Sequence, residues 1–126
     1  MITHFTWQEL TKTNTGLDNT PTDINRIANL IDLAKALDLL RAYYGKPIIV
    51  NSAYRSTEVN AKVGGVATSH HTMGLAADIT SKDFDSLKKA VLDYMLYKAD
   101  QVIVYEKQKF IHISIAPQMR HQLLYK

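Results

Sequence analysis

Two short segments alternate aliphatic residues with residues able to bind a metal, and this pattern constrains the fold more than any other feature. Residues 75–80 read LAADIT, and residues 110–115 read FIHISI. Alternate side chains of a β-strand share a face. The aliphatic set of each segment therefore points one way, and Asp78 or His112 points the other way. If helices cover both aliphatic sets, Asp78 and His112 lie together on the opposite side of the sheet.

A third residue of this kind, His71, precedes the first segment in a loop that can fold over the same face. Two imidazoles and one carboxylate suit a catalytic zinc site, because they leave the fourth tetrahedral position to water. Zinc lowers the pKa of such a water from 15.7 towards about 7, which favours hydrolysis of an amide. The chain has no cysteine, so disulfides and thiolate zinc sites are excluded.

The remaining pattern predicts an α+β fold in a single domain, residues 1–126, with helices on one face of a small, largely antiparallel sheet and the zinc site on the other. A capping box at Thr6 and Glu9 opens a short helix. We expect further helices after Thr22 up to Gly45, after Ser56, and over 83–97. Expected strands are 48–51 and 75–80, followed by a hairpin formed by 101–106 and 109–115.

Longer motifs carry a resemblance to a known family. The segment SHHTMGLAADI (69–79) resembles the S-x-H-x-x-G-x-A-x-D signature of the D-Ala-D-Ala carboxypeptidase family of zinc metallopeptidases, which cut peptide bonds in bacterial peptidoglycan. PIIVNSAYRSTEVNAKVGGV (47–66), and DQVIVYE followed by FIHIS, resemble other family segments. FTWQELTKTNTGLDN (5–19) resembles the start of the short, phage-associated branch. The resemblance implies the fold shared with phage endolysin peptidases and the hedgehog signalling domain, with Zn²⁺ as cofactor.

The resemblance also implies roles for individual residues. The zinc ligands would be His71, Asp78 and His112, with the preceding histidine on the variable position of the motif. Ser69 matches the motif serine that lies near bound substrate, although it can equally cap the loop. Arg55 matches the family arginine, which would hold the substrate's carbonyl oxygen or a terminal carboxylate. A structural salt bridge is the alternative role for this arginine.

The general base is the one catalytic group that these motifs do not assign. Better-known relatives place a carboxylate three residues before the last histidine ligand, where this chain has Lys109. Glu106 is predicted to act as catalytic base or acid, and Asp100 is the second choice. A three-residue hairpin loop would pair Glu106 with Phe110 on the His112 face, whereas a two-residue loop would turn it to the opposite face.

The expected function is zinc-dependent hydrolysis of peptide bonds in peptidoglycan stem peptides by a monomer, as a D-Ala-D-Ala carboxypeptidase or an endolysin-type endopeptidase. Two alternatives remain: a catalytically inactive zinc-containing binding module, and a structural component of phage or prophage origin. The net charge of +3 is dispersed along the chain, which argues against a nucleic acid partner.

The sequence also predicts where the protein acts. No apolar run is long enough to insert into a membrane. The N-terminal MITHFTWQEL lacks the basic start and apolar region of a signal peptide. We therefore expect a protein made in the cytoplasm that acts on the cell wall after release or export by another factor.

Overall fold

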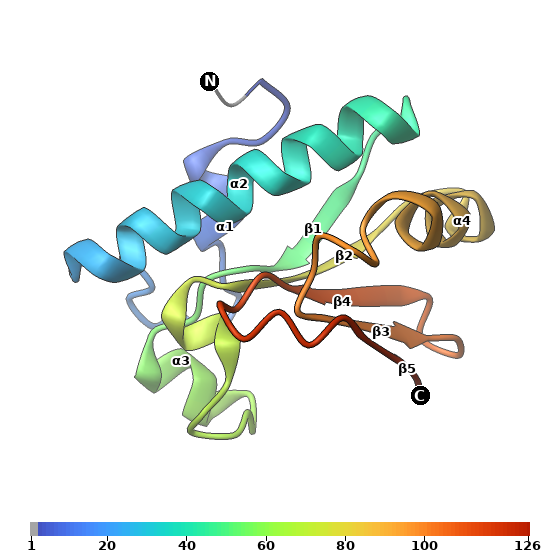
Figure 1. Ribbon diagram of the computed structural model, residues 1–126. Helices are drawn as coiled ribbons and strands as arrows, with labels where there is room; N and C mark the ends of the chain where they lie inside the picture. The colour runs from blue at the N-terminus through green and yellow to red at the C-terminus, as the bar shows by residue number, and fades with distance from the viewer. Residues whose placement is uncertain (1–2) are drawn as a thin grey trace.

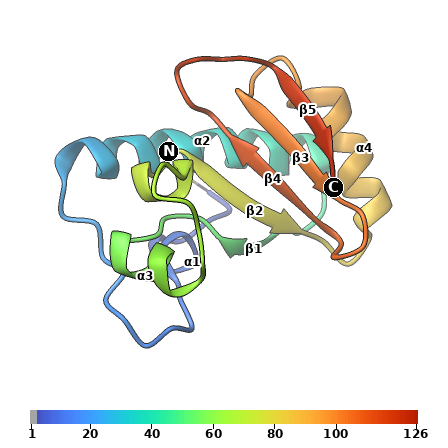
Figure 2. The ribbon, with the colours of Figure 1, turned by 90° about the horizontal axis from the view of Figure 1, so that it is seen from below.

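The computed structural model describes residues 3–126, so the first two residues of the predicted domain lie outside the described part. Its helices are α1 (Trp7–Thr11), α2 (Ile24–Tyr44), α3 (Thr57–Lys62), the 3₁₀ helix η1 (His70–Met73) and α4 (Phe84–Tyr94). Its strands are β1 (Ile49–Ser52), β2 (Ala76–Thr80), β3 (Gln101–Tyr105), β4 (Phe110–Ser114) and β5 (Gln122–Tyr125). Figure 1 shows α2 and α4 on the same side of the sheet, and in Figure 2 the sheet lies in front of both helices.

The five strands form one sheet in the order β1-β2-β4-β3-β5. The pairs β1–β2, β2–β4 and β3–β4 are antiparallel, but β5 runs parallel to β3. The sheet is therefore mixed, which corrects the expectation of a largely antiparallel sheet. The register gives the reason: Gln101, the first residue of β3, pairs with both Ser114 at the end of β4 and Gln122 at the start of β5, so β5 begins beside the start of β3 and runs in its direction.

Most predicted helix ends are confirmed. Thr6 and Glu9 form the expected capping box, and the left-handed Gly45 ends α2 at φ 78°. The N-cap of α2 is Asp23 rather than Thr22, because its carboxylate accepts hydrogen bonds from two backbone N–H groups of the first turn. The fourth helix ends at Tyr94 instead of residue 97, as the chain turns just beyond it.

The hydrophobic core fills the space between the sheet and the two long helices. Leu37 of α2 and Leu87 of α4 are fully buried there with Ile79, Ile111 and Ile113 of the two central strands. Burying each such side chain stabilises the fold by about 1.5–3 kcal/mol. Because the aliphatic side chains occupy the helical side, the polar residues between them face the open side of the sheet. No helix within residues 3–126 combines the length and the apolar character needed to cross a membrane.

Candidate metal centre

The structure brings together the three side chains that the strand pattern singled out. Asp78 of β2 pairs directly with His112 of β4, so their side chains project from the same face. The Asp78 Oδ1 atom lies 2.9 Å from His112 Nδ1 and 3.2 Å from His71 Nε2. One ligand atom from each residue lies within 4.8 Å of the other two. These three residues are the group of potential metal ligands found among residues 3–126.

The hydrogen bonds of His71 show that this group fits a cation. His71 Nδ1 lies 2.7 Å from the carbonyl oxygen of Ala53, so this nitrogen must donate. In a neutral ring Nε2 then carries a lone pair, yet it faces the acceptor-only carboxylate of Asp78. A proton or a metal ion between the two atoms removes this repulsion. A backbone carbonyl that fixes the far nitrogen is also the usual support of a histidine ligand.

The aspartate of the group is ionised and lies close to the positive charge of an arginine. Burial of the Asp78 carboxyl acts to raise its pKa, but the adjacent imidazoles of His112 and His71 outweigh burial and hold the pKa well below its usual range. The Arg55 guanidinium lies 3.5 Å from Asp78 Oδ2. The Arg55 side chain is also oriented by Ser52, whose Oγ accepts from Nε at 3.2 Å.

The 3₁₀ helix η1 positions His71 over the sheet. Ser69 caps this helix by accepting the His71 N–H, which is the capping role that the sequence left open. Gly74 ends η1 at φ 76°, and a Cβ atom there would lie 2.7 Å from the carbonyl oxygen of Arg26 in α2. The backbone N–H of Arg55 donates to the His71 carbonyl oxygen at 3.1 Å, which joins the arginine to the same support.

The structure does not bring Glu106 to this group. Tyr105 pairs with Phe110, so Glu106 lies in a four-residue turn that matches neither of the two loop lengths considered above. Its carboxylate lies 3.0 Å from the Lys88 ammonium of α4, on the helical side of the sheet. The left-handed backbone of Lys109, at φ 61°, permits this turn and sets the register.

Two further residues have partners that the sequence did not indicate. Asp100, the second choice for the base, is fully buried and accepts several hydrogen bonds from Arg120. His70 is only partly exposed, and its Nδ1 lies 2.6 Å from the buried Ser114 hydroxyl of β4. The strand alternation predicts that Ser114 shares the face of His112, but it does not predict the contact with His70.

Two histidines and one aspartate, gathered on the open face of a helix-covered sheet beside an arginine, define a metal-binding α+β domain. Residues 3–114 match the family described as peptidase M15, and the chain belongs to that family. Over 95 residues the chain is 32% identical to the zinc D-Ala-D-Ala carboxypeptidase of Streptomyces albus G. The match covers 72% of this chain and 37% of that protein, so the chain spans little more than a third of the relative's length.

Proposed function

We propose that this protein is a zinc-dependent peptidase that hydrolyses peptide bonds in peptidoglycan stem peptides, as a D-Ala-D-Ala carboxypeptidase or an endolysin-type endopeptidase. The observation that carries the proposal is the convergence of His71, Asp78 and His112 on one face of a peptidase M15 domain. The similarity to a zinc D-Ala-D-Ala carboxypeptidase supports the choice of metal and substrate class.

Each of the three ligands has a distinct support. Asp78 and His112 stand opposite each other on neighbouring strands, and the Ala53 carbonyl fixes the His71 ring. When bound, zinc supplies a Lewis acid that polarises a carbonyl and lowers the pKa of water. The anionic Asp78 offsets part of the metal's charge, which keeps the centre compatible with its half-buried environment.

Arg55 is proposed to stabilise negative charge that develops on the substrate's carbonyl oxygen. Its guanidinium lies beside Asp78 and is braced by Ser52, so its position does not depend on substrate. A fixed cation in a half-buried site acts strongly on developing charge, because little reorganisation is needed during the reaction.

Glu106 is the proton carrier expected from the sequence, but its ion pair with Lys88 argues against that role. To accept a proton at the metal centre, the Glu106 carboxylate would have to break its ion pair with Lys88 and move to the opposite face of the sheet. No other acidic side chain among residues 3–126 joins the three-residue ligand group. This favours one second candidate function: a zinc-containing module that binds peptidoglycan peptides without cutting them.

One experiment tests the proposal and separates the two candidates. Purified cell wall is digested with the protein, with the chelator-treated protein, and with the treated protein after zinc is restored. The products are identified by mass spectrometry, and zinc content is measured in parallel. We expect chelation to stop the release of cleaved muropeptides and zinc to restore it. A fully zinc-loaded protein that binds the wall and releases nothing would instead support the binding module.

A further inference from the structure

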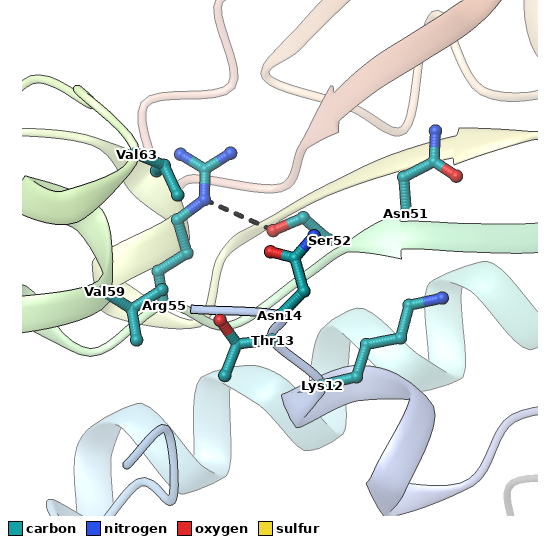
Figure 3. Close-up of a pocket in the computed structure, with 8 residues that line it drawn as sticks. All are labelled: Lys12, Thr13, Asn14, Asn51, Ser52, Arg55, Val59 and Val63. Carbon is teal, nitrogen blue, oxygen red and sulfur yellow. Dashed lines mark hydrogen bonds between the residues drawn. The ribbon is translucent and has the colours of Figure 1, made fainter. Parts of the chain in front are cut away.

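A cavity of about 410 Å³ lies between the loop after α1 and the edge strand β1, with Arg55 among its lining residues (Figure 3). Its charged lining residues are Lys12 and Arg55, and no acidic side chain lines it. The amides of Asn14 and Asn51 and the hydroxyl of Ser52 complete its polar wall. Two cations and several neutral donors favour an anionic ligand group with more than one acceptor oxygen.

One buried side chain joins the two backbone segments that carry the cationic residues. Asn19 is 6% exposed. Its Nδ2 donates to the carbonyl of the residue before Lys12 at 2.9 Å and to the carbonyl of the residue before Arg55 at 2.8 Å. Its Oδ1 accepts the N–H of the residue after Arg55 at 2.7 Å. The cavity is therefore braced before any ligand arrives, which lowers the entropy cost of binding.

The cavity also adjoins the candidate metal centre. Arg55 lines the cavity, and its guanidinium also lies 3.5 Å from Asp78 of the candidate metal centre. The cavity and the metal centre therefore share this residue. Lys12 forms no ion pair with any residue of the described part, 3–126, which leaves its ammonium available to a ligand. In Figure 3, Val59 and Val63 stand at the end away from Lys12 and give the cavity one apolar wall.

We propose that this cavity binds a carboxylate group of the peptide substrate and that Lys12 is a specificity-determining residue. The inference rests on the proposed function, because it places the anionic group next to the bond that would be cut. Peptidoglycan-type peptides offer two sources of this group: the free C-terminal carboxylate, and a carboxylate carried by an internal residue. Both present the same chemistry to Lys12, and the experiment below separates them.

The test compares three synthetic stem peptides: one with all carboxylates free, one amidated at the C-terminus, and one amidated at the internal carboxylate. For the wild-type protein we expect amidation of the group that enters the cavity to raise KM about tenfold, as for loss of a charge-assisted hydrogen bond. Amidation of the other group should change KM little. Lys12→Met should raise KM for the free peptide about as much and abolish the discrimination, whereas Lys12→Arg should retain it.

The matched control is Lys35→Met, which removes a positive charge from the exposed side of α2 and should leave the discrimination unchanged. Equal KM values for all three peptides, or full discrimination in Lys12→Met, would overturn the inference. Calorimetry of the same peptides with chelator-treated protein gives a second readout. Two results together would support the cavity assignment while overturning the peptidase function. In the first, binding depends on the carboxylate and is lost in Lys12→Met. In the second, the zinc-loaded wild type hydrolyses none of the peptides.

Discussion

At the scale of single residues, the partner of Glu106 decides how far the mechanism can be carried. A base that takes a proton from water must reach the metal centre, but this carboxylate is bound to Lys88. We expect Glu106→Gln to keep hydrolysis of cell wall within about threefold of wild type, because the pair that it breaks is partly exposed and contributes little. A loss of about 100-fold or more, with zinc content unchanged, would instead identify Glu106 as the proton carrier.

That Asp78 and His112 meet on one face of the sheet could be predicted from the sequence, whereas the surroundings of Glu106 could not. Asp78 and His112 each interrupt an aliphatic alternation, and a strand period of two residues fixes their face without further information. The position of Glu106 depends on the hairpin register, which a left-handed Lys109 determines. Lysine gives no local signal for that conformation, because glycine and asparagine are the residues that favour it.

At the scale of elements, the contact between η1 and α2 positions His71, and Gly74 permits that contact. Gly74→Ala would place a methyl group 2.7 Å from a backbone oxygen of α2, so the two elements must move apart. We expect a loss of about 2–4 kcal/mol in the free energy of unfolding, together with weaker zinc binding. Urea denaturation and zinc titration measure the two effects.

Gly45→Ala is the matched control for that substitution. Gly45 has nearly the same left-handed backbone, at φ 78°, but nothing lies within 4 Å of its added Cβ. This variant should lose only the conformational part, about 1 kcal/mol, and bind zinc normally. Equal losses in the two variants would show that the contact with α2 is not what holds η1 in place.

The strand β5 and its preceding turn depend on an ion pair that joins distant parts of the chain. Hydrogen bonds from Arg120 hold the pKa of Asp100 below its usual range, so the ionised carboxylate stabilises the fold. This contribution is complete when the pH is above the pKa of the carboxyl in the unfolded chain, about 3.9. It is lost as the pH falls through the lower pKa of the folded protein.

Asp100→Asn should therefore lower the free energy of unfolding at pH 7 by about 1–3 kcal/mol, and the difference from wild type should shrink below pH 4. Urea midpoints at pH 7 and pH 3 measure this, with the exposed Asp85→Asn as control. A difference that stays constant across this pH range would contradict the role of the ion pair.

The parallel direction of β5 could not be predicted from the sequence. β5 has only four residues, and the turn that leads to it is held by the Asp100–Arg120 pair, whose members lie far apart in the sequence. In the same way, the sequence places Lys12 in a polar loop, and hydrogen bonds of Asn19 help to hold that loop at the edge of the candidate site. Interactions between residues far apart in sequence leave no periodic pattern from which they could be read.

At the scale of the whole molecule, the three candidate ligands come from η1, β2 and β4, so we expect metal binding and folding to be coupled. Zinc that binds the folded state alone should raise its stability, by about 4 kcal/mol when free zinc is 1,000 times its dissociation constant. Thermal unfolding of metal-free protein with and without added zinc measures this increase.

Asp78→Asn should abolish the increase, because the amide keeps the shape of the side chain but loses the charge that offsets the metal. His121→Gln, which removes a surface imidazole elsewhere, should keep it. An equal increase in Asp78→Asn would show that zinc stabilises the protein from another site.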